Sequence, residues 1–116
     1  MKNDPNLGLN YEWVFRESGW NVGMDANLLK LGSVVHLSVL ADNLTTPPAS
    51  LTNGVRYIVS DGAISDWLNH EREIALYIDG AWQFYTPQNG WMCWVVARTT
   101  LVVYNALDWH DLISLT

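Results

Sequence analysis

The sequence is poor in charge: charged residues make up only 16% of its 116 residues, well below the usual quarter. The basic residues are scattered and form no stripe: Lys2, Arg16, Lys30, Arg56, Arg72 and Arg98. With a net charge of −6, the chain lacks the basic surface that nucleic acids and anionic membranes attract. We therefore expect no nucleic-acid partner and no membrane insertion.

Cysteine is almost absent, since Cys93 is the only one and cannot form an internal disulfide. Between Met92 and Trp94, we expect it to be a small buried hydrophobe rather than a nucleophile. The N-terminus has no apolar signal core, and no apolar run approaches the length of a membrane span. These absences predict synthesis in a reducing cytosol.

Motifs for catalysis and metal binding are also lacking. The histidines have no metal-ligand spacing, and the chain has neither a Gly-rich phosphate loop nor a nucleophile elbow. Asp108 and Asp111 near Trp109 could suggest a glycosidase pair with a sugar shelf, but so small a domain has little room for a substrate cleft. We expect a non-enzymatic protein without catalytic residues, metal or cofactor.

Apolar residues are plentiful, at 49% of the chain with seven tryptophans. Such a composition leaves room for an oligomer interface, because large exposed apolar patches usually mark contacts. Residues 1–20 form an expected extended arm whose apolar side chains alternate as in an edge strand: Leu7, Leu9, Tyr11, Trp13 and Phe15. The arm either packs on its own domain or reaches a neighbouring chain.

A short helix is expected over about residues 24–31, with Asn21 or Asp25 as its cap and Gly32 as its end. Its apolar stripe consists of Met24, Leu28 and Leu31. The stripe belongs either to the core or to a helical seam with sister chains. The helix could run on to Ala41, but glycine, serine and two adjacent valines favour a strand there.

A Pro-rich connector over residues 42–54 precedes a β-rich remainder. The expected strands are short and closely spaced: 55–60, 73–78, 81–85, 91–97, 100–105 and 108–113. They predict a small antiparallel meander of about five to seven strands. The predicted fold class is mainly β (α+β), with the arm over 1–20 and one domain over 21–116.

The pattern Tyr-x4-Trp occurs twice in this β-rich part. The expected cross-strand pairs are Tyr77 with Trp82 and Tyr104 with Trp109. Asp79-Gly80 predicts a two-residue turn in the first hairpin. The second copy lacks Asp-Gly, so we expect a four-residue loop over Asn105–Asp108 there.

The strand expected over 91–97 is apolar on both faces, and a strand of this kind must be covered on both sides. The helix, the arm or another subunit would supply the second cover. Tryptophans could instead offer flat faces to sugar rings, and the candidates are Trp67, Trp82, Trp91 and Trp109. The competing interpretation is that these tryptophans fill the core.

Several ordered motifs carry a family resemblance: Leu7–Leu9, Pro47–Ser50, Gly54–Val59, Asp79–Phe84, Gly90–Val95 and Trp109. They resemble a family of small phage-tail and fibre-associated domains of unknown function, which also occurs in gene-transfer-agent tail proteins. The resemblance extends from about residue 5 to residue 112. The segment after the first motif and the last hairpin depart from the family pattern, so their contacts can differ here.

The resemblance implies a virion component of the phage tail, made in the bacterial host cytoplasm, as a structural or adaptor protein of the fibre or baseplate. Expected partners are further copies of the chain in a homotrimer and other tail or fibre proteins. The expected subunit interface consists of Leu7, Leu9, Trp13, Phe15, Met24, Leu28 and Leu31. The alternative function is a receptor-binding tip that recognises host surface glycans through exposed tryptophans.

Overall fold

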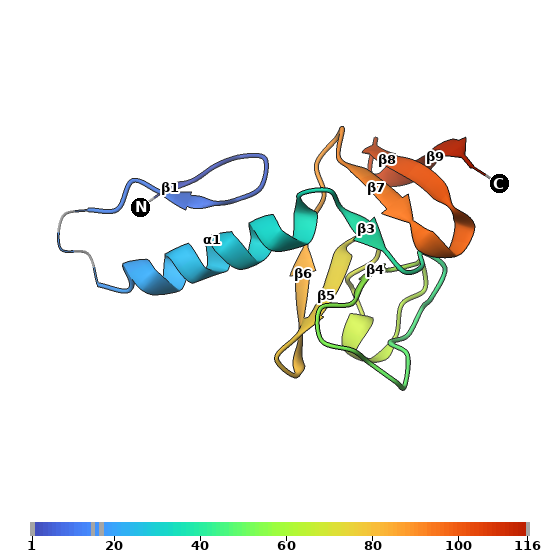
Figure 1. Cartoon of the computed structure of the whole chain (residues 1–116), viewed down its shortest axis with the longest axis horizontal. Helices are drawn as coiled ribbons and strands as arrows, with labels where there is room; N and C mark the ends of the chain where they lie inside the picture. Colours follow the sequence, from blue (N-terminus) through green and yellow to red (C-terminus); the bar gives the residue numbers. More distant parts are fainter. Residues whose placement is uncertain (1, 15, 17, 116) are drawn as a thin grey trace. The chain divides into compact units, whose positions relative to one another are not determined.

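The computed structural model describes residues 2–14, 16 and 18–115. The chain forms two compact units, residues 1–36 and 37–116, and Figure 1 labels the helix α1 and most of the strands. The helix therefore groups with the N-terminal segment, whereas the sequence predicted a division after residue 20. Phe15, one of the predicted interface residues, lies outside the described residues.

The N-terminal unit is a small hairpin with a helix. Its elements are β1 (Lys2–Asn3), β2 (Asn10–Tyr11) and α1 (Trp20–Val34), with β1 antiparallel to β2. The Asp4 carboxylate accepts hydrogen bonds from the backbone N–H groups of Leu7 and Leu9, at 2.9 and 2.5 Å, and these bonds lower the pKa of Asp4. The predicted extended arm is therefore a hairpin with an internally bonded loop.

Helix α1 is longer at both ends than the predicted helix over 24–31, and it continues through Gly32. Gly19, not Asn21 or Asp25, occupies the cap position. Asn27 ties the helix to the hairpin, because its Oδ1 accepts a bond from the Asn10 N–H at 2.7 Å and its Nδ2 donates to the Asn10 carbonyl at 2.8 Å. Such tertiary contacts offset the weak helix propensity of glycine and β-branched residues.

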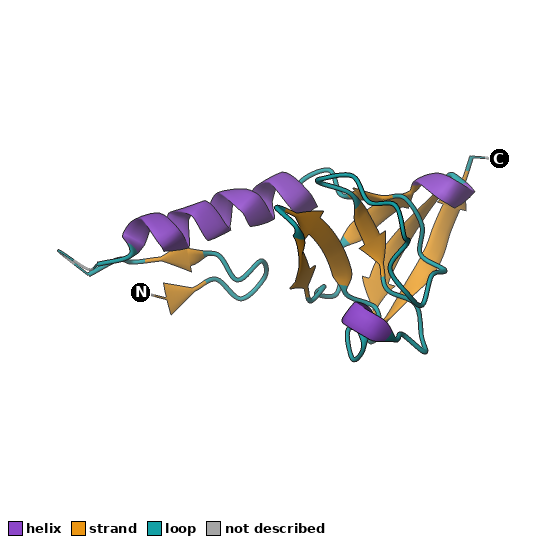
Figure 2. Ribbon diagram, turned by 90° about the horizontal axis from the view of Figure 1, so that it is seen from below, coloured by secondary structure: helices purple, strands orange, loops and turns teal. Residues whose placement is uncertain are grey.

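The C-terminal unit contains two sheets (Figure 2). The four-stranded sheet has the order β3 (Ser38–Val39), β7 (Met92–Val95), β8 (Thr100–Asn105) and β9 (Asp108–Ser114). The three-stranded sheet has the order β4 (Arg56–Ile58), β5 (Ile74–Ile78) and β6 (Ala81–Tyr85). Two short 3-10 helices, Ser65–Trp67 and Val96–Arg98, complete the unit.

The two sheets meet where β3 leads into the following segment. The Leu40 N–H donates to the Arg56 carbonyl at 3.0 Å, and the Ile58 N–H donates to the Ala41 carbonyl at 3.2 Å. Strand β3 runs parallel to β7, so the strands do not form the single antiparallel meander that the sequence predicts. The mainly β fold class is confirmed, and the nine strands of the described residues exceed the prediction because several have only two residues.

The β5–β6 hairpin confirms the first aromatic pair. Asp79 and Gly80 have φ of 51° and 79°, as a type I′ turn requires at both central positions. Tyr77 lies opposite Trp82 with ring centroids 5.2 Å apart. Local turn chemistry and strand pairing therefore agree in this hairpin.

The β8–β9 hairpin confirms the second pair but corrects its loop. Tyr104 lies opposite Trp109, also with centroids 5.2 Å apart. Asn105 pairs with Asp108, so the turn contains only Ala106 and Leu107, at φ of 53° and 66°. Strand pairing forces both residues into a conformation that their side chains disfavour.

The left-handed backbone of Ala106 and Leu107 is expected to be strained, and residues that tolerate this conformation should relieve the strain. Replacing Ala106-Leu107 by Asn-Gly should raise the free energy of unfolding by about 1–2 kcal/mol, because these residues tolerate positive φ. Chemical denaturation of the double variant measures the gain. The reciprocal exchange of Asp79-Gly80 for Ala-Leu should destabilise the protein, and a double variant no more stable than the parent would refute the strain.

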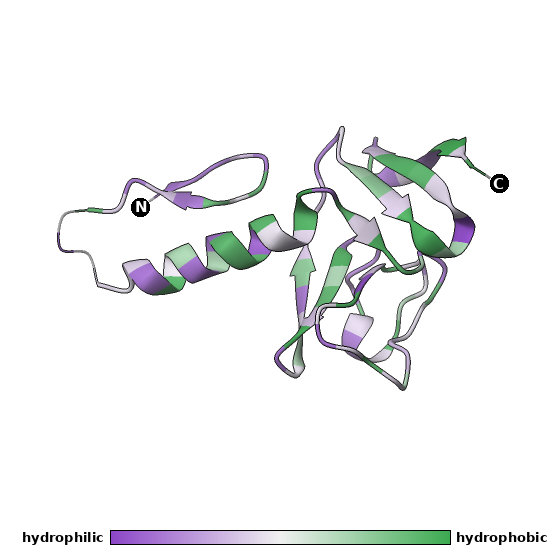
Figure 3. Ribbon diagram, in the orientation of Figure 1, coloured by the Kyte–Doolittle hydropathy of each residue, from purple (hydrophilic) through white to green (hydrophobic). Residues whose placement is uncertain are grey.

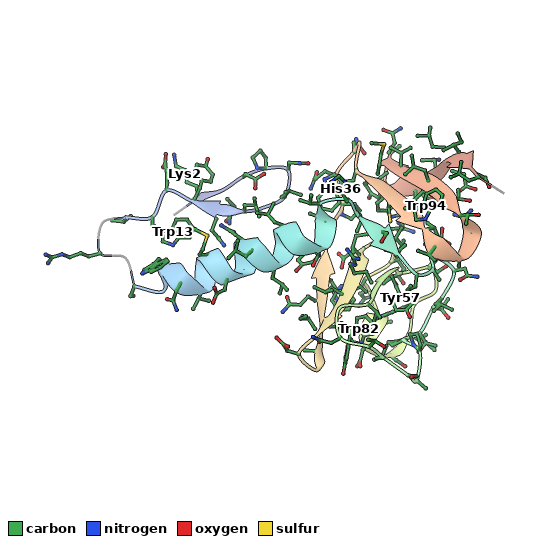
Figure 4. The ribbon with its side chains drawn as sticks, in the orientation of Figure 1. Lys2, Trp13, His36, Tyr57, Trp82 and Trp94 are labelled. Carbon is green, nitrogen blue, oxygen red and sulfur yellow. The ribbon has the colours of Figure 1, made fainter. Side chains whose placement is uncertain are left out.

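A buried cluster packs β4 and β5 against the segment that connects them, and it consists of Tyr57, Val59, Ala63, Trp67 and Ala75. Trp67, one of the candidates for contact with a sugar ring, is completely buried because the 3-10 helix directs it inward. Its ring contacts Tyr57 and Trp82, with centroids 5.6 and 5.3 Å away, and Figure 4 labels both of these partners. Cys93 is buried as predicted, and burial raises the pKa of its thiol to about 12.

Candidate functional site

The first candidate surface is an apolar stripe on α1, defined by Trp20, Met24, Leu28 and Leu31. At 100° per residue these positions lie on one side of the helix. Leu28 is 60% exposed, Trp20 and Met24 are exposed, and Leu31 is half-buried. The buried positions of α1 are instead the polar Asn27 and Ser33. The helix therefore presents apolar side chains that the described part of its unit leaves open.

The second candidate surface is the outer face of the four-stranded sheet. Strand register places five apolar side chains together on it: Met92, Trp94, Leu101, Val103 and Ile113. Met92 and Ile113 are exposed, whereas the other three are half-buried. Figure 3 shows apolar residues along these strands and along α1. Cys93 and Val95, on the opposite face of β7, are completely buried. The two-faced strand is thus covered on one side only by the described residues.

The third candidate is a polar pocket of about 160 Å³ in the C-terminal unit. Four separate segments supply its polar lining: Asp42, Ser60 with Asp61, Arg72, and Asp108 with Trp109. Ile58 and Val59 add apolar surface. The pocket therefore combines hydrogen-bond acceptors, a guanidinium group and an aromatic ring.

The backbone of Arg72 helps to shape this pocket. Its φ of 67° is left-handed, and its N–H donates to the Val59 carbonyl at 2.8 Å. Its carbonyl accepts a bond from Trp109 Nε1 at 2.9 Å. Its side chain forms an ion pair with Asp61. Trp109 is thus held at the pocket by a specific bond as well as by its contact with Tyr104.

A second arginine holds another carboxylate of the pocket. Arg98 Nη2 lies 2.6 Å from Asp42 Oδ2, and Nε lies 3.1 Å from Asp42 Oδ1. The same guanidinium binds both oxygens of Asp111 at 3.0 Å, which lowers the pKa of Asp111. Asp111 is thus engaged by Arg98, and of the proposed carboxylate pair only Asp108 lines the pocket.

The four candidate tryptophans do not share one surface. Trp67 is buried in the core, which overturns its prediction as a sugar platform. Trp82 is half-buried and packs against Trp67 and Tyr77. Trp91 and Trp109 are half-buried, and of the four only Trp109 lines the pocket. Of the four tryptophans, Trp109 therefore remains the candidate for contact with a sugar ring.

Among the expected interface residues, Met24 and Leu28 are exposed on α1. Leu7, Leu9, Trp13 and Leu31 are half-buried. The polar pocket residues Asp42, Ser60, Asp61 and Arg72 were missed, because each stands in a different segment and no local spacing links them. Their only sequence signal is that each lies at the end of an expected strand or next to one.

Two further findings bear on function. Within residues 2–14, 16 and 18–115, no three histidine, cysteine or acidic side chains gather as a metal-binding group. Over the same residues, no helix has the length and apolar character needed to cross a bilayer.

Comparison with known families gives one match. The family model described as "Protein of unknown function (DUF2793)" matches residues 24–110. No curated protein matches the chain significantly. The family match includes most of α1 and the C-terminal unit as far as the start of β9, so the chain belongs to the DUF2793 family of proteins of unknown function.

Proposed function

We propose that the chain is a non-enzymatic structural or adaptor protein of a phage tail fibre or baseplate, assembled as a homotrimer. The observation that carries this proposal is the exposed apolar stripe of α1. A single helix with apolar side chains in water is stabilised when the same stripe of another copy covers it. The motif resemblance to phage-tail domains supplies the setting, a virion component made in the bacterial cytoplasm.

An adaptor also needs a second contact surface, and the C-terminal unit offers one. Met92 and Ile113 are exposed to solvent on the outer face of the four-stranded sheet. Exposed apolar patches on soluble proteins mark contact sites. We assign this face to another tail or fibre protein and the stripe of α1 to self-association.

Self-association is tested by Leu28→Glu. An ionised carboxylate in a helical seam is costly to bury, so the substitution should weaken association by about 100-fold or more. Light scattering coupled to gel filtration should give three times the 13.1 kDa chain mass for the parent and the single-chain mass for the variant.

Val22→Glu is the matched control, because Val22 is equally exposed on α1 but lies on the side opposite the stripe. It should leave the trimer intact. A monomeric parent protein, or equal dissociation by both substitutions, would overturn the self-association. Mass spectrometry of purified phage particles tests the setting, and absence of the chain from tails would contradict it.

A receptor-binding tip that recognises host surface glycans is the second candidate function. The observation that favours it is the polar pocket beside Trp109, not a row of exposed tryptophans. Indole and carboxylate groups together suit a ligand that has both apolar ring faces and hydroxyl groups. Adsorption of the purified protein to host cells, before and after removal of their surface polysaccharide, tests this function.

A further inference from the structure

We infer that the polar pocket binds one neutral, hydroxyl-rich sugar ring, as the terminal unit of a surface glycan. This assignment rests on the second candidate function and names its ligand class and site. It is independent of trimer formation, because all of the pocket residues belong to the C-terminal unit. Four properties of the pocket restrict the ligand. They are its volume, the orientation of its hydrogen-bond acceptors, its charge and the indole ring of Trp109.

The size of the pocket limits the ligand to a single small ring. A volume of about 160 Å³ corresponds to about five water molecules in the liquid. Pockets for drug-sized molecules are larger, about 300–1,000 Å³. One sugar unit fits this scale, and the remainder of a glycan would extend into solvent.

The acceptors of the pocket are already oriented. Asp42 is held by Arg98, Asp61 by Arg72, and Asp108 Oδ1 accepts a bond from the Trp109 backbone N–H at 2.8 Å. An ionised carboxylate has about four acceptor positions, so each keeps free lone pairs after this anchoring. Sugar hydroxyls can donate to them at little ordering cost, which favours binding.

Charge selects against anionic ligands. Three carboxylates line the pocket and Arg72 is the only basic residue in that lining. A phosphate, a uronic acid or a sialic acid would meet net negative charge and be repelled. A neutral polyol therefore matches the pocket better than an anion.

The aromatic wall supplies the apolar contact that a sugar ring requires. Trp109 is fixed by its bond to the Arg72 carbonyl at 2.9 Å and by its edge contact with Tyr104. Aromatic side chains with an apolar body and a polar handle favour ligands of mixed character. Trp109 lines the pocket, so its fluorescence is expected to change when a ligand binds there.

The test is calorimetric titration of the full chain with methyl glycosides of glucose, galactose, mannose and N-acetylglucosamine. At least one should bind saturably, with a Kd on the order of 1 mM for so small a ligand. Asp108→Asn should weaken this binding by about ten-fold, because the hydrogen bond to a charged carboxylate becomes a weaker bond to a neutral amide. Asp66→Asn removes the same charge from an exposed position outside the pocket and should change nothing.

Further binding measurements identify the class of ligand and the position of its site. Equal weakening by Asp108→Asn and Asp66→Asn would overturn the pocket assignment. Tighter binding of inositol, calcium chloride or methylammonium than of every glycoside would overturn the sugar assignment. Failure of all glycosides and of cell adsorption would refute the glycan function itself. Glycoside binding that Trp91→Ala abolishes, but Asp108→Asn leaves intact, would retain the function and place its site elsewhere.

Discussion

Replacing Trp67 by alanine should lower the free energy of unfolding by about 3–5 kcal/mol, the range for removing a buried large aromatic side chain. Trp67 is 0% exposed and packs between Tyr57 and Trp82. Alanine would leave a cavity that two aromatic rings cannot fill without moving. Urea denaturation followed by circular dichroism measures the loss.

Trp67→Phe should cost much less than Trp67→Ala. No acceptor among the described residues bonds the buried Trp67 Nε1, so phenylalanine retains an aromatic ring and removes an unpaired polar group. Leu68→Ala is the positional control, because Leu68 is exposed on the same loop and should change stability by about 0.5 kcal/mol or less. A Trp67→Ala variant as stable as Leu68→Ala would disprove the role of Trp67 in the core.

Replacing Arg98 by alanine should cost about 1–2 kcal/mol at pH 7, after allowance for the partial exposure of its guanidinium. Arg98 joins Asp42, the first residue of the connector, to Asp111 in the last strand. Asp42 is the more buried carboxylate, with 17% of its side chain exposed. Most of the stability lost in Arg98→Ala should therefore come from Asp42, which would remain half-buried without a charged partner.

The contribution of Arg98 should depend on pH. Because Arg98 lowers the pKa of Asp111 in the folded protein, the stabilisation is complete above the unfolded carboxyl pKa of about 3.9 and is lost as pH falls through the folded pKa. The stability difference between the parent and Arg98→Ala should therefore shrink from pH 7 to pH 3. Denaturation at both pH values measures it.

Two substitutions separate geometry from charge at this position. Arg98→Lys keeps the charge but cannot bind two carboxylates in the same forked manner, so its stability should lie between those of the parent and Arg98→Ala. Asp111→Asn should lose part of the pH dependence, whereas Asp108→Asn on the same strand should retain it. A stability difference that stays constant down to pH 3 would contradict the assigned ion pair.

Local sequence signals predicted those features that neighbouring residues can impose. Asp79-Gly80 specifies its turn, and the turn sets the Tyr77–Trp82 register without help from distant residues. The bounds of β6 and β8 follow similarly from short apolar runs between turn residues. In contrast, Ala106-Leu107 carries no turn signal, and only the pairing of β8 with β9 forces its two-residue turn.

Helix α1 likewise has one feature that local sequence predicted and another that depends on distant residues. Its apolar stripe was visible in the spacing of Met24 and Leu28, but its length was not. The Asn10–Asn27 bonds hold α1 against the hairpin, and contacts between residues this far apart leave no periodic pattern in the sequence. The burial of Trp67 in an otherwise polar loop has the same origin.

By itself, the sequence determined the mainly β class, the two aromatic pairs and the excess of apolar surface, because composition, periodicity and turn chemistry act over a few residues. The tertiary structure alone decided the parallel contact of β3 with β7, the division after residue 36 and the pocket that joins Asp42, Asp61, Arg72 and Asp108. These features depend on long-range pairing, whose energy comes from packing and hydrogen bonds between segments that are distant along the chain.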